Sequence, residues 1–307
     1  MNLFEILNKG ECGTFNLRID KSCAVLCTLA EAQINNAFKY STLKLVVNGN
    51  AVYNVNRKLY KLAQNEYLLS NGGQEGGGII DSKKEVSQFC IHIKPSFLAG
   101  AYQALARDNF DIDKPVDEYP DFRLFENTYH LNSSTTVSRQ LRPLAAMINE
   151  GRESDIVLDE EWLLKLTEAI VLNEKNISLS VNRLNTAKLS TRNEIMKRLL
   201  IGKDYMDTFF MTDPKIADIA RFAFMSEFFF YRNFKLAFKT TPYQYILDKK
   251  IGLAKELMFN NKMTLSDIAA SCGFPDIYTF SKAFKRKYGF APSKTREFYD
   301  KEMPVAV

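Results

Sequence analysis

The chain has 307 residues, of which 46% are hydrophobic and 25% are charged, a composition typical of folded globular proteins and not of disordered or fibrous ones. At roughly 100 to 200 residues per domain, this length predicts two domains. The formal net charge is +5, and no apolar run reaches the roughly 18 residues of a membrane span. The first residues also lack the pattern of a secretion signal, so we expect a cytoplasmic protein that does not enter a membrane.

Histidine and cysteine, which supply many metal ligands, are scarce. The two histidines are His92 and His130, and the five cysteines are an odd number without a CxxC pair. Cys23 and Cys27 lie four residues apart, but no second pair of ligands follows at metal-binding spacing. The sequence therefore predicts reduced cysteines, no metal and no cofactor.

Residues 38–94 have the pattern of short antiparallel strands. Leu43, Leu45 and Val47 alternate along the chain, and Asn48-Gly49-Asn50 then leads into the run 51–55. Asn-Gly between two such runs is a strong hairpin signal, because both residues tolerate a positive φ. More strands are expected at 59–62, 66–69 and 86–93, with a glycine-rich turn at 71–78 and earlier strands at 13–19 and 24–29. This succession predicts an antiparallel sandwich or a small barrel.

After Pro95 the spacing of apolar residues becomes helical, and helices are expected at 96–106, 136–149 and 159–176. One largely apolar face of the third helix combines Trp162, Leu163, Leu166, Ala169, Ile170 and Asn173. Packing of this helix on its own barrel would explain the face, and so would a dimer interface. The length of the face favours a homodimer, although the sequence does not separate the two explanations.

Charge is distributed unevenly along the chain. Residues 188–307 contain 21 Lys and Arg against 13 Asp and Glu, a net charge of +8, whereas residues 1–187 contain 20 against 23, a net charge of −3. A basic domain attached to a mildly acidic one is typical of a module that binds a polyanion. A solvated basic surface would give the same balance. We therefore expect a domain over 1–187 and a second over 188–307.

Between Arg192 and Phe298 one pattern occurs twice, about fifty residues apart. Each copy has a short helix with Asp-Ile-Ala, a tight turn, and a longer aromatic and basic helix that ends near a proline. The short helices are expected at 213–220 and 264–270, and the long ones at 227–238 and 276–288. Each copy reads as a helix-turn-helix, whose second helix enters the major groove of DNA.

The spacing of the aromatic residues predicts which side of each long helix is free. Phe230 and Phe234 in the first copy, and Phe280 and Phe284 in the second, should face the core. Phe229 has two interpretations, core packing or base contact. The candidate DNA-binding residues are Phe228, Tyr231, Arg232, Lys235, Ile277, Tyr278, Thr279, Lys282 and Lys285.

A further helix is expected at 243–260, between the two copies. At 1.5 Å per residue it would span about 27 Å. That length suits two reading helices on one face of DNA, in successive major grooves roughly 34 Å apart.

These residues resemble the DNA-binding domain of AraC/XylS-type transcriptional regulators. The likeness covers about 110 residues and is carried by DIAASCGF at 267–274 and FSKAFKRKYGFAP at 280–292. The resemblance implies that base contacts fall on the candidate residues above, with the exception of Lys235 and Lys285. This chain departs from the family pattern at Phe224 and Lys239, where glycine is common, and the departures concern the geometry of the first turn.

Residues 1–187 resemble, more weakly, the cupin-type sensor domain, with the likeness carried by NGN at 48–50 and YKLAQNEYLLSN at 60–71. The resemblance implies a jelly-roll barrel with an effector site. Enzymatic cupins bind metal through paired histidines, and here the turn after residue 70 has none, so we expect no catalysis. Strand alternation places Gln88 and His92 on one face of their strand. The candidate effector-binding residues are Tyr40, Tyr53, Tyr67, Gln88 and His92.

The sequence thus predicts a sequence-specific transcriptional regulator with an N-terminal sensor and dimerisation domain. By resemblance, it is an activator that contacts RNA polymerase and responds to a small polar or sugar-like effector. One alternative is a regulator whose barrel docks a protein partner and has no small-molecule pocket. Another is a cupin-type enzyme with an accessory helical domain, which the missing histidines disfavour.

Overall fold

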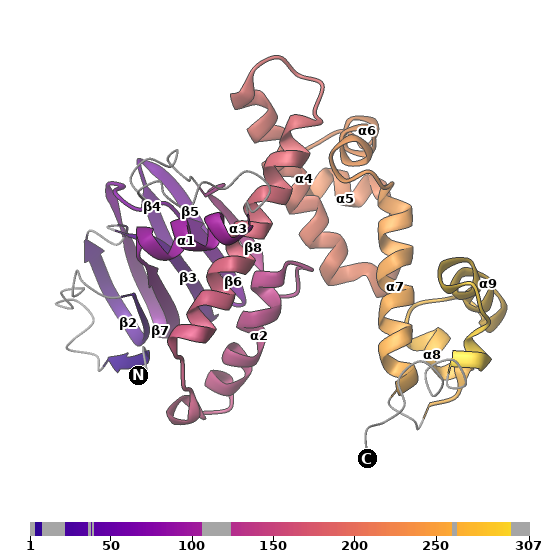
Figure 1. Ribbon diagram of the computed structural model, residues 1–307, viewed down its shortest axis with the longest axis horizontal. Helices are drawn as coiled ribbons and strands as arrows, with labels where there is room; N and C mark the ends of the chain where they lie inside the picture. The colour runs from indigo at the N-terminus through magenta and orange to yellow at the C-terminus, as the bar shows by residue number, and fades with distance from the viewer. Residues whose placement is uncertain are drawn as a thin grey trace. The chain divides into compact units, whose positions relative to one another are not determined.

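The computed structural model describes residues 4–7, 22–35, 38, 40–105, 124–259 and 263–295. Contacts divide the chain into two compact units, Met1–Leu179 and Ser180–Val307. The division lies N-terminal to the boundary expected after residue 187, near the end of a long helix. A β-sheet and helices form the first unit, and the described part of the second is helical (Figure 1). This two-domain class, a β domain with helices followed by an all-α domain, agrees with the prediction.

Eight strands of the N-terminal unit form one sheet. In chain order they are β1 (Phe4–Leu7), β2 (Cys23–Asn35), β3 (Ser41–Asn48), β4 (Ala51–Val55), β5 (Lys58–Leu62), β6 (Glu66–Ser70), β7 (Gly76–Ile93) and β8 (Asn127–His130). The order across the sheet is β1-β2-β7-β3-β6-β8, while β4 pairs with β5 and β7. All described pairs are antiparallel except β1 with β2.

The long strand β7 makes the sheet curl over a single interior. Its first part pairs with β4, as in Val52 opposite Ile79, and its last part pairs with β3, as in Leu45 opposite Phe89. The Tyr53 hydroxyl on β4 donates a hydrogen bond to Gln88 Oε1 on the last part of β7. Therefore β4 covers the face formed by β3 and β7, and residues of six strands share one apolar core.

Most of the predicted strands fall within observed ones, and two predictions need comment. The strand expected at 13–19 lies outside the described residues. The glycine-rich turn is wrong in its last part, since Gly76 to Gly78 begin β7. At Gly76 the backbone has φ 146°, and an added Cβ would lie 1.9 Å from the carbonyl oxygen of Asn54. Close pairing with β4, and not strand propensity, selects glycine there. Strands β1 and β8 were not predicted because four residues are too few to reveal a period.

Three α-helices accompany the sheet: α1 (Pro95–Leu105), α2 (Thr136–Asn149) and α3 (Glu160–Asn182), with the 3₁₀ turn η3 (Glu153–Asp155) between the last two. The α-helices correspond to the predicted ones, and α3 extends six residues further than expected. The apolar face of α3 is buried within the chain, with Leu166 and Ile170 fully inaccessible. That face is therefore core, and the interpretation of it as a dimer interface is wrong.

The C-terminal unit repeats one helical pair around a shared helix (Figure 1). After α4 (Leu189–Phe209) and the 3₁₀ turn η4 (Phe210–Thr212) come α5 (Ile216–Phe222), α6 (Glu227–Phe238), α7 (Pro242–Phe259), α8 (Leu265–Ser271), α9 (Ile277–Tyr288) and the 3₁₀ turn η5 (Pro292–Lys294). The short helices α5 and α8 have 7 residues each, and the long helices α6 and α9 have 12 each. Phe230, Phe234, Phe280 and Phe284 are fully buried, as predicted. No helix in the described ranges is both long and apolar enough to cross a membrane.

The first helical pair keeps the backbone geometry of the second without its glycines. Phe224 (φ 55°) occupies the turn position that Gly273 (φ 72°) fills in the second pair, and Lys239 (φ 57°) ends α6 as Gly289 (φ 83°) ends α9. The Phe224 carbonyl accepts a hydrogen bond from Arg198 Nη1 at 3.1 Å. The departures from the family pattern therefore leave the turn intact, at a conformational cost of roughly 1 to 2 kcal/mol per residue.

Lys239→Gly should stabilise the C-terminal domain, since glycine adopts the left-handed conformation freely. After allowance for the greater freedom of glycine in the unfolded chain, we expect the free energy of unfolding to rise by about 0.5 to 1 kcal/mol. Denaturant titration measures this. As a control, Glu256→Gly on the exposed side of α7 should lower the free energy of unfolding by about 1 kcal/mol. A loss of stability in Lys239→Gly would contradict the assignment of strain.

Candidate nucleic-acid interface

The long helices α6 and α9 present equivalent exposed faces. All nine candidate DNA-binding residues are exposed except Tyr231, which is half-buried. Seven of them lie within the first six residues of their helices: Phe228, Tyr231, Arg232, Ile277, Tyr278, Thr279 and Lys282. Lys235 and Lys285 lie in the last turns. Each helix therefore offers a polar and aromatic start followed by a basic end.

Large apolar side chains stand in solvent at the start of both helices. The exposed fractions of Phe228 and Tyr278 are 76% and 73%. Phe229 is 43% exposed, which excludes a place in the buried core. Burial of these rings against a binding partner would remove apolar surface from water and thereby stabilise the complex. Apolar contacts of this kind include those with the methyl group of thymine.

The start of α9 is capped by an acidic side chain. Asp276 Oδ1 accepts a hydrogen bond from the backbone N–H of Thr279 at 2.6 Å, and Oδ2 accepts one from the Thr279 hydroxyl at 3.0 Å. The bond from the Thr279 backbone, and to a lesser extent that from its hydroxyl, lowers the pKa of the Asp276 carboxyl. The Thr279 hydroxyl is thus engaged within its own helix, although its oxygen can still accept a bond. In α6 the equivalent residue, Ser226, makes no side-chain cap.

The basic side chains of the two helices differ in their availability. Arg232, Lys235, Lys282 and Lys285 are exposed. Lys287, by contrast, donates to Asp248 Oδ1 of α7 at 2.8 Å. These four exposed cations lie on the same sides of their helices as the aromatic residues, as a surface that binds phosphates and base edges requires.

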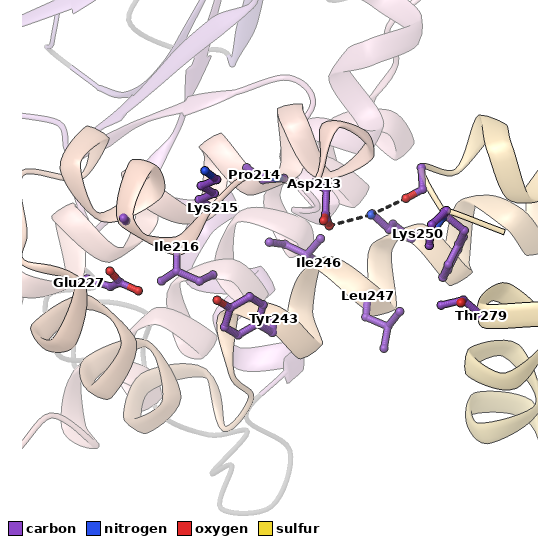
Figure 2. A pocket seen from close by; sticks show the side chains of 14 residues that line it. Asp213, Pro214, Lys215, Ile216, Glu227, Tyr243, Ile246, Leu247, Lys250 and Thr279 are labelled. Atoms are coloured by element: carbon purple, nitrogen blue, oxygen red, sulfur yellow. Dashed lines mark hydrogen bonds and ion pairs between the residues drawn. The ribbon is translucent and has the colours of Figure 1, made fainter.

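A buried ammonium joins the two helical pairs. Lys250 of α7 is 5% exposed, and its Nζ donates to Asp213 Oδ1 at 3.0 Å and to the carbonyl oxygen of Gly273 at 2.7 Å. Asp213 precedes α5, and Gly273 forms the turn between α8 and α9. Figure 2 shows the ammonium between these two oxygens. Sequence reasoning missed Lys250, because nothing in its neighbourhood along the chain marks it as a contact between the pairs.

A groove of about 650 Å³ lies between the pairs. Residues of both helical pairs line it, together with the first half of α7 (Figure 2). Glu227, the first residue of α6, and Thr279 of α9 both belong to the lining. The starts of the two exposed helices therefore flank one groove.

The turn of the second pair also contacts the segment before the first. A Cβ added to Gly273 would lie 2.1 Å from the carbonyl oxygen of Met211 in η4. Only glycine allows this approach, and the positive φ of the turn requires glycine as well. Together with Lys250, this contact fixes how the two pairs are placed relative to each other.

A second buried network attaches α7 to α4. The Asp207 carboxylate of α4 is fully buried and contacts Lys203 Nζ at 3.3 Å and Lys249 Nζ at 3.1 Å. It also accepts a hydrogen bond from the Tyr245 hydroxyl at 2.5 Å. Burial opposes the charged form of Lys203, but the Asp207 carboxylate outweighs it and raises the pKa of Lys203. The helix that carries both pairs is thus held at several points.

The candidate effector-binding residues do not form one cluster. Tyr53 and Gln88 are buried and hydrogen-bonded to each other, and His92 lies on the same face of β7. Tyr67 lies on the opposite face of the sheet, where its hydroxyl bonds to Thr135 and Ser138 beside α2, so its inclusion with the others is wrong. Tyr40 is half-buried at the start of β3. Among the described residues no three His, Cys, Asp or Glu side chains are grouped as metal ligands would be.

Two helix-turn-helix pairs on a common helix define a DNA-binding class of domain. Residues 219–297 match the family model described as a helix-turn-helix domain. The chain is 35% identical over 100 residues, 33% of its length, to the probable transcriptional regulator LumQ of Photobacterium leiognathi, of which 40% is covered. It is 34% identical over 83 residues, 27% of its length, to the Msm operon regulatory protein of Streptococcus mutans, of which 30% is covered. The match to the transcriptional activator RhaS of Escherichia coli is 24% over 205 residues, covering 66% of this chain and 65% of RhaS.

Solved structures are more distant. ToxT of Vibrio cholerae O395 aligns with 89% of this chain and 96% of its own, at 15% identity and a TM-score of 0.32. The DNA-binding domain of AdpA, solved with a target DNA, aligns with 33% of this chain and 96% of its own, at 21% identity and a TM-score of 0.30.

Residues 219–297 therefore match a helix-turn-helix domain, and this part of the chain is similar to the transcriptional regulator LumQ. The matches to the regulators LumQ and Msm span less than half of those proteins.

Lys250→Met should loosen the joint between the two helical pairs. The variant keeps an apolar stem but removes both hydrogen bonds of the ammonium. Hydrogen bonds to charged groups contribute about 1.5 to 3 kcal/mol, so we expect the free energy of unfolding of the C-terminal domain to fall by about this amount. Denaturant titration measures the loss. For the exposed Lys188→Met, the free energy of unfolding should stay within about 0.5 kcal/mol of that of the parent protein. Equal stability of the two variants would contradict the role of Lys250 in linking the two helical pairs.

Proposed function

We propose that the protein is a sequence-specific DNA-binding transcriptional regulator in which α6 and α9 enter successive major grooves. The observation that carries the proposal is the pair of equivalent exposed helix faces, held in one arrangement by Lys250 and Gly273. Helix α7 has 18 residues and a length of about 27 Å. With the thickness of the flanking helices, this suits the spacing of roughly 34 Å between successive major grooves.

Each exposed face combines side chains for two tasks. Arg232 and Lys282 can donate to the acceptors of guanine, while the aromatic residues beside them can contact thymine. Lys235 and Lys285, farther along their helices, suit phosphate contacts, which position a protein without reading sequence. The groove between the pairs would then face the DNA backbone that separates the two major grooves, with Lys215 among its lining residues.

The regulatory role is proposed to be activation through contact with RNA polymerase, in the cytoplasm where the DNA lies. One relative of this chain, RhaS, is named a transcriptional activator. In this proposal the N-terminal unit is no enzyme but a sensor, whose small-molecule effector binds inside the curled sheet. An effector acts only if it binds the DNA-competent and incompetent arrangements with different affinities. A sheet interior that binds no small molecule would favour the docking of a protein partner.

Homodimerisation is proposed through the outer side of α3. Leu164, Leu172 and Leu179 are 42%, 39% and 47% exposed, and their spacing of eight and seven residues places them on one side of the helix. Exposed leucines repeated in this way are typical of a helix that packs against a second copy.

Replacement of a base-reading side chain should relax base preference. For Arg232→Ala and Lys282→Ala we expect a loss of about 1 to 3 kcal/mol on the preferred site, with weaker discrimination at one base pair each. Lys285→Ala should weaken binding to all sequences and reduce the salt dependence by about one phosphate contact. Selection from random-sequence DNA by the full chain, followed by titration at several salt concentrations, measures both effects. Unchanged base preference in Arg232→Ala would mean that α6 is a scaffold.

Charge on the outer side of α3 should separate the proposed dimer. Burial of Leu164 and Leu172 in an interface excludes an unpaired carboxylate, because burying such a charge carries a large penalty. The double variant Leu164→Glu, Leu172→Glu should therefore be monomeric in light scattering at concentrations where the parent protein is dimeric. The exposed Leu59→Glu on β5 is the matched control and should stay dimeric. A monomeric parent protein would exclude this interface.

A further inference from the structure

A lysine inside the curled sheet lacks a counter-ion within the described residues. Lys44 of β3 is 3% exposed. The buried cations of the other unit have carboxylate partners, Asp207 for Lys203 and Asp213 for Lys250. For the Lys44 ammonium, the described part of the chain provides neither a carboxylate at ion-pair distance nor a hydrogen-bond acceptor. Its charge is therefore buried without the partner that buried lysines usually have.

Two aromatic rings compensate this charge only in part. Lys44 Nζ lies 6.0 Å from the ring centre of Phe38 and 5.9 Å from that of Tyr53. Cation–π attraction reaches about 2 kcal/mol at a desolvated site, whereas the effective penalty for burying one ion is several kcal/mol. A deficit remains, and an anion next to the ammonium would remove it.

The neighbours of Lys44 on the same face are hydrogen-bond donors. Lys44 pairs with Cys90 across β3 and β7, so Gln88 and His92 are its diagonal neighbours. The side chain of Gln88 is 1% exposed. Its Oε1 accepts a hydrogen bond from the Tyr53 hydroxyl, while its Nε2 has no hydrogen-bond partner among the residues that the structure describes. An amide donor buried without an acceptor is rare in folded proteins and calls for one.

His92 adds no second positive charge to the cluster around Lys44. Its Nδ1 lies 3.3 Å from the Thr42 hydroxyl, and the ring is buried. Burial lowers the pKa of His92 well below its usual range, and the charge of Lys44 lowers it further. The ring is therefore neutral near pH 7, and the cluster carries one positive charge with spare donors.

We propose that the interior of the curled sheet binds a small organic monocarboxylate, whose oxygens accept from Lys44 Nζ and Gln88 Nε2. A single buried cation matches a single negative charge, whereas a doubly charged phosphate would leave one charge buried and unpaired. The rings of Phe38 and Tyr53 suit a ligand with an apolar or aromatic body. The inference rests on the proposed function in one respect, since it makes this monocarboxylate the effector of the regulator.

Calorimetric titration of the full chain tests the charge of the ligand directly. The probes are matched pairs of equal shape, benzoate with benzamide and hexanoate with hexanamide, together with inorganic phosphate. At least one carboxylate should bind about tenfold or more tightly than its amide, a difference of about 1.4 kcal/mol. Phosphate should bind no better than the amides. Equal binding of both members of each pair, or tighter binding of phosphate, would overturn the proposal.

Variants identify the residues that hold the carboxylate. Lys44→Met and Gln88→Leu should each weaken carboxylate binding about tenfold or more, while Lys61→Met, on an exposed position of β5, should not change it. Without ligand, Lys44→Met should unfold at an equal or higher temperature than the parent protein, because it removes an unpaired buried charge. A lower unfolding temperature together with unchanged carboxylate affinity would show that Lys44 is structural, and the proposal would fall.

The DNA selection by the full chain separates this inference from the proposed function. If the protein selects a DNA sequence but binds none of the carboxylates, the regulator remains and the monocarboxylate site is wrong. If carboxylates bind through Lys44 but no sequence is selected, the ligand site stands and the proposed function fails. If carboxylates bind but leave DNA affinity unchanged, the site is not an effector site, and the inference fails in its regulatory part.

Discussion

The arrangement of the C-terminal unit depends on the buried ammonium of Lys250. One charge satisfies an acceptor from each helical pair, Asp213 before the first and Gly273 in the second. Gly273 belongs to the turn that leads directly into α9, whereas Asp213 precedes α5, the short helix of the first pair. The bond therefore positions the exposed helix of the second pair relative to the first pair. The backbone contact between Gly273 and Met211 acts in the same sense. The two pairs therefore behave as one body with two equivalent faces.

The sequence predicted the repeat well because the repeat is local. Helical spacing and the fifty-residue recurrence depend on neighbours along the chain, and they placed α5, α6, α8 and α9 and the four buried phenylalanines. The joint at Lys250 brings together residues 37 and 23 positions apart, and no periodicity reports such a contact. The same limit applies to α3, because the sequence does not show whether its apolar face packs within the chain or against a second copy. It applies also to Tyr67, because alternation along one strand does not show which residues of other strands share its face.

Buried lysines occur in both domains with opposite surroundings. Lys203 and Lys250 contact acidic side chains and contribute to the arrangement of helices. Lys44 faces rings, an amide and a neutral imidazole. A lysine whose charge is paired within the protein stabilises one arrangement of the chain. A lysine without a counter-ion can instead stabilise a bound anionic ligand. The first kind suits the proposed DNA-binding unit, and the second suits the proposed sensor unit.

Helix α7 also constrains how the chain can vary. One inserted residue in a helix advances everything after it by about 1.5 Å and turns it by about 100°. Within α7 between Lys250 and α8, such an insertion would swing Gly273 away from the ammonium and turn α9 away from the side that α6 presents. The length of α7 should therefore stay fixed during evolution.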